Sequence, residues 1–386
     1  MSTNGPLIVA GSVAQRPGKG GHTWVFLQYL LGFKKLGRPV MLLDRLEPEM
    51  CIDRKGHPST PEQSWNLEYL HTVMASFGLG DAYAVLLGSK KSFGLSHTEV
   101  LERVEGSSLL LNVNGFIDDP NVLALAPRRA FLDIDPGFGQ MWRELDLHDP
   151  FRGHDLYVTI GERIGRPDCR VPTGGLDWVT TPQPVVLDLW PVQEPGGDAF
   201  TSVGSWRGRF GPIEFEGQTY GLRVHEFRKF ARLPTLVRER FEIALDIDAA
   251  ETRDLELLRE CGWTLTDPAL AAADPYSYRT FVQRSRAEFM VAKNMYVRSR
   301  SGWFSDRSIC YLASGKPVLA EETGFSELYP TSEGLLSYST LEEAAEGVQR
   351  ITADYELHAR RARAIAEEHF DSDKILPRLL LSLGVA

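Results

Sequence analysis

The chain has 386 residues, more than a single hydrophobic core usually serves, so we expect two domains. Its composition, 43% hydrophobic and 24% charged, is that of a globular protein, and its formal net charge of -10 argues against a nucleic-acid partner. The four cysteines form no C-x-x-C pair, which argues against zinc and redox motifs and is typical of a reducing cytoplasm.

The N-terminus reads as a strand, a glycine-rich turn, a helix and a second strand. The apolar run at 6–12 predicts a buried strand, and the turn Gly18–Thr23 follows it. The segment Trp24–Leu36 predicts an amphipathic helix, and Pro39–Asp44 predicts the next strand. No charged signal segment and no transmembrane-length apolar run is visible, so we expect a soluble cytoplasmic protein.

Alternating strand and helix patterns continue through the chain and predict two Rossmann-like, doubly wound α/β domains facing a cleft. We expect one domain over 1–190, a second over 191–355 and helices over 356–386. Proline and glycine are frequent in 165–197, which predicts the connection between the domains. The predicted strands are 84–87, 108–112, 130–135, 155–160, 199–204, 241–246, 264–266, 295–298 and 317–320, and the later helices are 224–233, 250–261, 276–291, 305–314 and 341–370.

The most informative segment is Val297–Ser308, which has the sequence VRSRSGWFSDRS. Ser305 is a good N-cap for the following helix, and Asp306 near the helix start favours the helix dipole. A strand–loop–helix start presents free backbone N–H groups to a phosphate, and Gly302 lets the backbone approach a ligand. Arginines, Arg300 among them, supply positive charge in an acidic chain. The same pattern also fits an ordinary helix cap with solvated arginines.

A second strand end converges on this segment. The helix closes at Ser314-Gly315, the next strand follows, and Glu322-Thr323-Gly324 stands at its carboxyl end. Ligands of open α/β sheets bind outside the carboxyl ends of the strands. The sequence therefore predicts one crevice formed by both segments.

These segments resemble the donor-site region of GT-B glycosyltransferases. One branch of that family carries H-C-G-W-N-S in this loop, and Ser301-Gly302-Trp303 with Ser305 is similar to it. Another branch has a helix ending in C-G-K-P-V-I-A and then an acidic residue and glycines, which resembles Gly315–Val318 and Glu322–Gly324. The resemblance covers the C-terminal half and, more loosely, the first 45 residues.

The resemblance implies that 1–190 is the acceptor-side domain, that 191–355 is the donor-nucleotide domain, and that the helices over 356–386 cross back to the first domain. It places the donor pyrophosphate at Gly302, Trp303, Phe304 and Ser305, with Arg300, Ser301 and Asp306 beside it, and the donor sugar at Glu322, Thr323 and Gly324. The family usually has a ribose-binding Glu where this chain has Cys310, and Asp306, one helical turn earlier, is the candidate substitute. In the same family the first strand of this domain ends in a glycine loop, which Gly204 and Arg207 match.

The resemblance also gives a candidate base. Inverting members carry a G-H-x-x-P loop after the first strand, and Gly20-Gly21-His22 matches it without the proline. A neutral imidazole is a suitable base near neutral pH, and Asp133 or Asp135 would orient it. Gly20 and Gly21 would form the acceptor-side loop. Helix capping by His22 and a retaining mechanism without this base remain alternatives.

The sequence thus predicts a glycosyltransferase that moves a sugar from a nucleotide-sugar such as a UDP-sugar to an acceptor hydroxyl or amine. We expect no metal, because no Asp-x-Asp stands in the donor loop, and no other cofactor. The expected partners are the donor and a small-molecule or glycan acceptor, without nucleic acid or a membrane span. A sugar-nucleotide epimerase of the same architecture and a non-catalytic binding relative are the alternatives, and Cys310 favours the latter.

Overall fold

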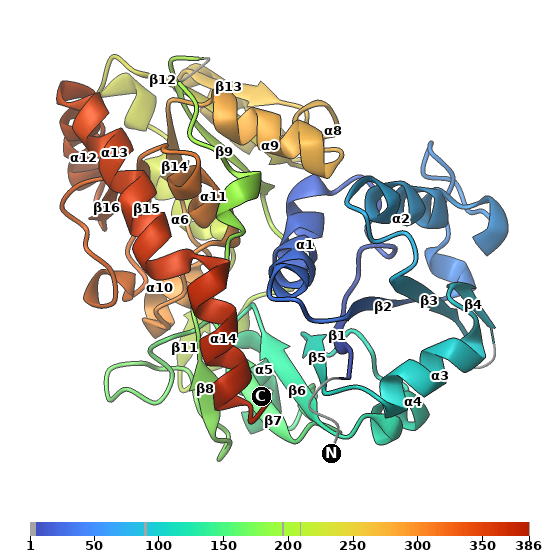
Figure 1. Ribbon diagram of the computed structural model, residues 1–386. Helices are drawn as coiled ribbons and strands as arrows, with labels where there is room; N and C mark the ends of the chain where they lie inside the picture. Colours follow the sequence, from blue (N-terminus) through green and yellow to red (C-terminus); the bar gives the residue numbers. More distant parts are fainter. Residues whose placement is uncertain (1–4, 89–90, 195–196, 209, 386) are drawn as a thin grey trace.

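The computed structural model describes residues 5–88, 91–194, 197–208 and 210–385, which form two α/β domains and a set of closing helices (Figure 1). In Figure 1 the N-terminal domain is blue to green, and the C-terminal domain runs from yellow-green to orange. No helix in these ranges is long and apolar enough to cross a membrane.

The N-terminal domain contains a sheet in the order β4-β3-β2-β1-β5-β6-β7-β8. Its neighbouring strands are parallel, except that β4 pairs antiparallel with β3 at the edge. β1 and β5 are buried along their whole length, as expected of strands covered by helices on both faces. The strands are β1 (Leu7–Ala10), β2 (Val40–Leu46), β3 (Tyr83–Leu87), β4 (Lys91–Gly94), β5 (Leu109–Val113), β6 (Arg129–Asp133), β7 (Leu156–Thr159) and β8 (Trp178–Thr180).

The helices of this domain cover both faces of the sheet (Figure 1). Several begin at side-chain caps, such as Ser64, whose oxygen accepts a hydrogen bond from the Leu67 N–H group, and Ser96, which forms a capping box with Glu99. The helices are α1 (Gly20–Lys35), α2 (Trp65–Ser76), α3 (His97–Glu105), α4 (Pro120–Leu125) and α5 (Phe138–Glu144), with short 3₁₀ turns at Pro48–Met50, Pro61–Gln63 and Leu187–Leu189.

The C-terminal domain contains a parallel sheet in the order β13-β12-β9-β14-β15-β16. Strand order reverses between β9 and β14, and sheets of this kind bind ligands outside the carboxyl ends of the strands at such a point. A small antiparallel hairpin, β10–β11, follows β9. The strands are β9 (Ala199–Ser205), β10 (Ile213–Phe215), β11 (Gln218–Tyr220), β12 (Arg240–Asp246), β13 (Trp263–Thr266), β14 (Ala287–Met290), β15 (Val318–Glu321) and β16 (Leu335–Tyr338).

The remaining helices pack around this sheet and then return to the first domain. Helix α14 lies against α1, and Asp371 pairs with Val185 in a parallel bridge. The helices are α6 (Arg223–Phe230), α7 (Thr252–Glu260), α8 (Pro268–Ala271), α9 (Pro275–Arg284), α10 (Asn294–Ser299), α11 (Asp306–Ala313), α12 (Leu341–Ala353), α13 (Tyr355–Ile365) and α14 (Ser372–Ser382), with 3₁₀ turns at Leu233–Thr235 and Phe325–Glu327 and a π-helix at Ala366–Phe370.

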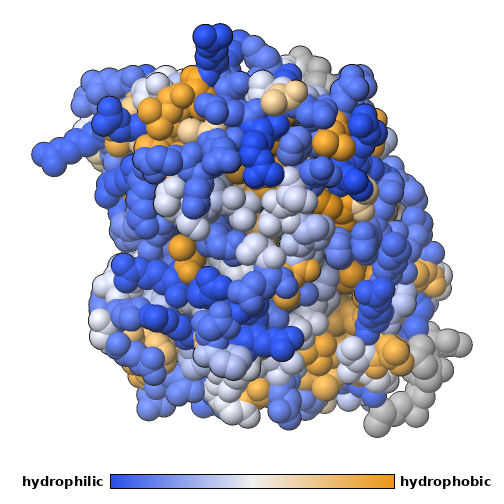
Figure 2. All heavy atoms as spheres, turned by 90° about the vertical axis from the view of Figure 1, so that its left-hand side faces the viewer, coloured by the Kyte–Doolittle hydropathy of each residue, from blue (hydrophilic) through white to orange (hydrophobic). Residues whose placement is uncertain are grey.

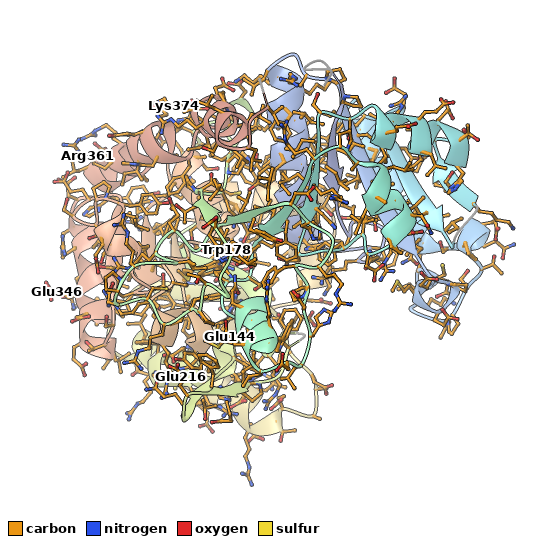
Figure 3. The ribbon with its side chains drawn as sticks, turned by 90° about the horizontal axis from the view of Figure 1, so that it is seen from below. Glu144, Trp178, Glu216, Glu346, Arg361 and Lys374 are labelled. Carbon is orange, nitrogen blue, oxygen red and sulfur yellow. The ribbon has the colours of Figure 1, made fainter. Side chains whose placement is uncertain are left out.

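One hydrophobic core cluster passes from the first domain into the second. The Trp24 ring packs 4.9 Å from that of Trp190, and its indole N–H donates to the Pro275 carbonyl at 2.8 Å. The outer face over the C-terminal helices is mostly hydrophilic (Figure 2). Figure 3 shows the charged side chains of Glu346, Arg361 and Lys374 along the outer side of these helices.

The two Rossmann-like domains confirm the expected fold class, but four expected elements differ. Residues 295–298, expected as a strand, lie in the helix α10, and the strand is instead β14, inside the expected helix 276–291. The sequence of β14 includes the charged residue Glu288, so it does not look like a buried strand. In the structure Arg307 forms an ion pair with Glu288, which allows its burial. Helix α1 begins at Gly20 rather than Trp24, and Asp354 interrupts the expected helix 341–370 by capping a new one.

Candidate functional site

The carboxyl ends of the two sheets face each other across the domain boundary. Asp135 follows β6 of the first domain, and Lys293 follows β14 of the second. The Lys293 ammonium and the Tyr296 hydroxyl both donate to the Asp135 carboxylate. Burial would raise the pKa of Asp135, but the Lys293 charge and these hydrogen bonds hold it below its usual value. Asp135, expected to orient a base, thus anchors the second domain.

An arginine lies at the end of β9. Arg223 is the first residue of α6, and its Nη1 atom lies 1.8 Å from the position that a β-carbon on Gly204 would take. One nitrogen of the guanidinium group therefore points at Gly204, the glycine expected to face the donor phosphates. Asn294 fixes the start of α6, because its side chain accepts from the Gly221 N–H group at 2.7 Å and donates to Glu226.

A second arginine approaches the same strand end from α11. The Arg307 side chain is 8% exposed, its Nε donates to Glu288 at 2.5 Å, and its Nη1 donates to the Val203 carbonyl at 2.8 Å. Burial opposes the Arg307 charge, but the Glu288 carboxylate raises the pKa of Arg307 above its usual value. Arg307 thus remains a cation inside the domain.

These two arginines form a cationic pair with unused donors. Burial and the repulsion of Arg307 lower the pKa of Arg223 to about 10, which still leaves it charged at neutral pH. Across the described residues, the buried Arg223 Nε and Arg307 Nη2 atoms have no hydrogen-bond partner. Unpaired buried donors are costly, so this arrangement is suited to an anion bound between β9 and β14.

The segment from Ser299, the last residue of α10, to Ser305, the cap of α11, is called the 299–305 loop and is joined to the turn 322–324. Ser305 caps α11 as predicted, because its hydroxyl accepts from the Arg307 N–H group at 3.2 Å. The Gly302 N–H group donates to the Thr323 carbonyl at 2.8 Å, and the Thr323 hydroxyl donates to the Trp303 carbonyl at 2.5 Å. The Gly302 N–H group, expected to bind phosphate, is therefore already used to hold the two segments together.

The aromatic side chains of the loop are core residues. The Trp303 ring stacks 4.3 Å from that of Tyr296, and Phe304 packs against Phe325, Tyr329 and Phe370. Ser301 is completely buried, and its hydroxyl accepts from the Trp303 N–H group at 3.4 Å. These residues support the loop, so a ligand would meet backbone groups rather than their side chains.

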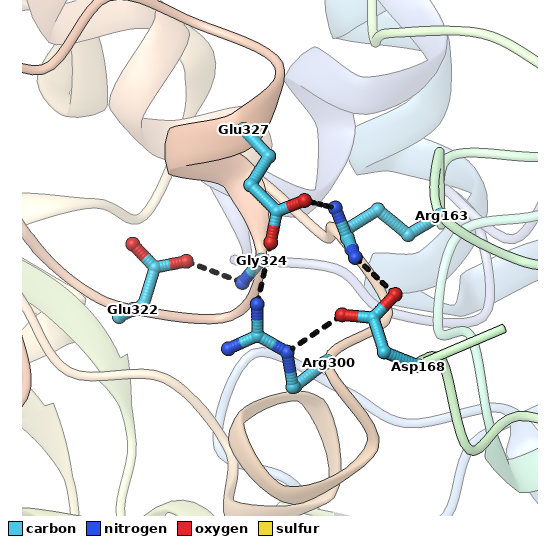
Figure 4. A network of polar contacts seen from close by, with 6 residues as sticks. All are labelled: Arg163, Asp168, Arg300, Glu322, Gly324 and Glu327. Carbon is cyan, nitrogen blue, oxygen red and sulfur yellow. Dashed lines mark hydrogen bonds and ion pairs between the residues drawn. The ribbon is translucent and has the colours of Figure 1, made fainter. Parts of the chain in front are cut away.

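Arg300 is not a free cation, because it takes part in an ion-pair network (Figure 4). Its Nε donates to Asp168 at 3.1 Å, and its Nη2 donates to Glu327 at 2.5 Å. Arg163 of the first domain bonds the same two carboxylates. Glu322, expected beside the donor sugar, accepts from the N–H group of Gly324. The sequence pattern marked Arg300 as a phosphate ligand, but the nearby acids compete for it.

The space beside Cys310 is nearly closed. A cavity between α1 and α11 has a volume of about 10 Å³ and is lined by Gly21, Gln28, Asp306 and Cys310 among others. It holds about one water molecule. Burial raises the pKa of Asp306, and burial also raises that of the Cys310 thiol. The position expected for a ribose ligand is therefore filled by α1, and a nucleotide there requires the domains to separate.

The expected base stands at the start of α1. The His22 imidazole Nε2 lies 2.9 Å from the Ser12 hydroxyl, and the His22 ring packs edge-on against Phe26 and Phe116. Gly20 and Gly21 let α1 approach the second domain, since a β-carbon on Gly20 would lie 2.1 Å from the Asp274 carbonyl oxygen. The Gly20 N–H group donates to the Ala272 carbonyl at 2.7 Å. The glycine-rich turn is thus part of the domain contact.

Arg207 was expected with Gly204, but Arg223 takes that place. The Arg207 side chain is 48% exposed and forms a bidentate pair with Glu251. The hairpin β10–β11 separates the two arginines in the sequence and brings α6 back over β9. The local signal that identifies Arg223 is its place at the first position of a helix, two residues after Gly221.

Comparisons with known proteins agree with this architecture. Residues 229–380 match the family described as Glycosyl transferase-like. A search of curated proteins found no match.

Solved structures match along the whole chain. Alpha-glucosyltransferase in complex with UDP is 11% identical, with 98% of this chain and 99% of that chain covered and a TM-score of 0.60. Sucrose-phosphate synthase from Thermosynechococcus elongatus is 13% identical, with 98% and 99% covered and a TM-score of 0.55. Anabaena HepE in complex with UDP and glucose is 12% identical, with 99% and 100% covered and a TM-score of 0.55. The chain therefore has the GT-B fold of these glycosyltransferases.

Proposed function

We propose that this glycosyltransferase-like protein of the GT-B fold transfers a sugar from a UDP-sugar to an acceptor hydroxyl or amine. The observation that carries the proposal is the pair of cations Arg223 and Arg307, which both reach the strand end at Val203 and Gly204 and each keep one unused N–H donor. A diphosphate at the end of β9 would complement this positive charge. Two of the structurally similar enzymes were solved with UDP, which supports the choice of nucleotide.

In the proposed reaction the acceptor oxygen or nitrogen attacks the anomeric carbon of the donor sugar. The bond from that carbon to the diphosphate oxygen breaks, and its electron pair leaves with UDP. Arg223 and Arg307 stabilise the charge that develops on this leaving group. The products are the glycosylated acceptor, UDP and one proton.

His22 is the proposed base that receives the acceptor proton. It stands at the carboxyl end of β1, with its Nε2 atom 2.9 Å from the Ser12 hydroxyl. We expected a carboxylate to orient the imidazole, but the Asp135 carboxylate is bonded by Lys293 and Tyr296. In the proposed mechanism the Ser12 hydroxyl orients the imidazole instead. Asp135 is then a residue that positions the second domain.

We propose that the reaction needs neither a metal nor another cofactor. The two arginines supply the positive charge that a divalent cation provides in other transferases. In the described part of the chain, no group of three or more His, Cys, Asp or Glu side chains is placed to hold a metal ion.

The proposed acceptor is a small molecule or a glycan. One similar structure contains alpha-glucosyltransferase with a 13-mer DNA, but this chain has a formal net charge of -10, which disfavours a polyanionic acceptor. We propose a cytoplasmic location, because all four cysteines are free and two of them are buried.

Release of UDP from a panel of UDP-sugars tests this function. The protein is incubated with each donor, with and without mixed small-molecule and glycan acceptors, and with and without EDTA. Acceptor-dependent UDP release that EDTA leaves unchanged supports the proposal, and Arg223→Met should abolish it. Interconversion of donor sugars without an acceptor would favour an epimerase, whereas UDP binding without turnover would favour a binding relative.

A further inference from the structure

A segment of the first domain lies on the 299–305 loop of the second. We call residues 161–170, the start of the connection between β7 and β8, the strap. The Arg163 N–H group donates to the Ser301 carbonyl at 3.0 Å, and the Arg170 N–H group donates to the Ser299 carbonyl at 2.8 Å. The strap therefore fixes the loop backbone from the opposite side of the domain boundary.

Arg163 is the most buried member of the ion-pair network. Its side chain is 7% exposed, whereas those of Asp168 and Glu327 are each 49% exposed. Arg163 and Arg300 each bond both carboxylates, so positive and negative groups alternate around a closed ring (Figure 4). The planar fork of arginine can bridge two carboxylates in this way, whereas a lysine ammonium is a single point of charge.

The apolar stem of Arg163 also fits between two glycine turns. A β-carbon on Gly302 would lie 2.7 Å from Arg163 Cγ, and one on Gly324 would lie 2.5 Å from Arg163 Cδ. Both glycines have positive φ angles, 74° and 98°. One side chain of the first domain thus contacts both segments expected to hold the donor.

The strap lies beside the two points where the chain crosses between domains. Glu162 accepts a hydrogen bond from the Tyr329 hydroxyl, and the Tyr329 ring packs 4.8 Å from that of Phe370. The Phe370 carbonyl accepts from the Val185 N–H group at 2.7 Å, which joins the two crossings. The strap is therefore tied to the residues that join the two domains.

We propose that Arg163 is a positioning residue for the donor site. It holds the 299–305 loop and the 322–324 turn together from the other domain, so donor affinity depends on a residue that need not touch the donor. The inference rests on the proposed function, because it assigns the two segments to a nucleotide-sugar. The other part of the proposal, that Arg163 orders both segments, does not depend on any ligand.

The test compares Arg163→Met and Arg163→Lys with the wild type. The control is Arg129→Met, which removes a bidentate arginine from a pair with Asp155 at the amino end of β6. UDP affinity is measured by calorimetry, thermal stability by melting, and loop order by amide hydrogen exchange over 299–304 and 322–325. Glu327→Gln, which removes the charge of one partner, serves if Arg163→Met does not fold.

We expect Arg163→Met to weaken UDP binding about tenfold, within the range for residues that act through others, and to speed exchange in both segments. Arg163→Lys should weaken UDP binding and speed exchange less than Arg163→Met does. Arg129→Met should change neither the UDP affinity nor the exchange rates. Lower melting temperature with unchanged UDP affinity would overturn the proposal, since Arg163 would then be structural. If the wild type binds no UDP, the proposed function fails, and the exchange rates alone decide whether Arg163 orders the segments.

Discussion

The Nη1 atom of Arg223 occupies the space beside Gly204, 1.8 Å from where a β-carbon would stand. Gly204→Ala must therefore displace the guanidinium group. The displaced group is the end of a flexible side chain, so we expect a small change in the free energy of unfolding. We expect UDP affinity to fall by about tenfold, the loss of roughly one charge-assisted hydrogen bond. Calorimetry and denaturant unfolding on the same protein separate the two effects, and an unchanged affinity would contradict the placement of the anion.

Arg307→Met should destabilise the fold far more than Arg223→Met. Glu288 is completely buried, and removing Arg307 leaves its carboxylate without a counter-charge, which costs about 3–5 kcal/mol. Arg223 has no ion pair among the described residues and lies next to another cation, so its loss removes repulsion. Urea unfolding measures both values. Arg307→Met with Glu288→Leu should recover most of the loss, and a double variant as unstable as the single one would contradict this account.

Gly324→Ala should cost more stability than Gly37→Ala. Both residues have positive φ angles, 98° and 75°, so both substitutions carry the backbone penalty of about 1–2 kcal/mol. A β-carbon on Gly37 meets nothing within 4 Å, whereas one on Gly324 meets Arg163 at 2.5 Å. Overpacking adds about 1–3 kcal/mol at Gly324. Equal unfolding free energies for the two variants would show that Arg163 does not press on this turn.

Glu162→Gln should change how stability depends on pH. Burial raises the pKa of Glu162 to about 7, although the Tyr329 hydroxyl donates to it. Between about pH 4.3 and pH 7 the unfolded chain releases this proton while the folded chain retains it, so the wild type loses stability as pH rises. Glutamine accepts the same hydrogen bond and does not titrate. Melting curves should coincide near pH 4 and diverge in favour of the variant by pH 7.5; parallel curves would refute the raised pKa.

The sequence predicted the architecture because several strands, such as β1 and the first half of β2, are continuous apolar runs that follow a proline. The buried strand β14 was not predicted, because Glu288 interrupts its apolar sequence and the ion-pair partner Arg307 is 19 residues away in the sequence. Because β14 was missed, the strand was expected in what is α10, where Met295, Tyr296 and Val297 resemble a strand in composition. Helix α10 forms because tertiary contacts, such as the stacking of Tyr296 on Trp303, outweigh that preference.

The site was predicted in part, because helix caps and glycine turns leave local signals and ion pairs do not. Ser305 was identified as a cap from its position alone. Arg163 and Glu327 are 164 residues apart, so no pattern in either segment indicates that they pair. Arg207 and Arg223 both follow β9, and only the path of the β10–β11 hairpin decides which of them returns to Gly204.

The most direct test of the central claim, a nucleotide site at Arg223 and Arg307, is thermal melting with a panel of nucleoside diphosphates. A ligand at about 100 times its dissociation constant adds ~2.7 kcal/mol to the free energy of unfolding. The account predicts that UDP raises the melting temperature of the wild type, that Arg223→Met removes this shift, and that Arg228→Met, which breaks an outer pair with Asp254, retains it. A shift of equal size in Arg223→Met, or no shift with any diphosphate, would contradict it.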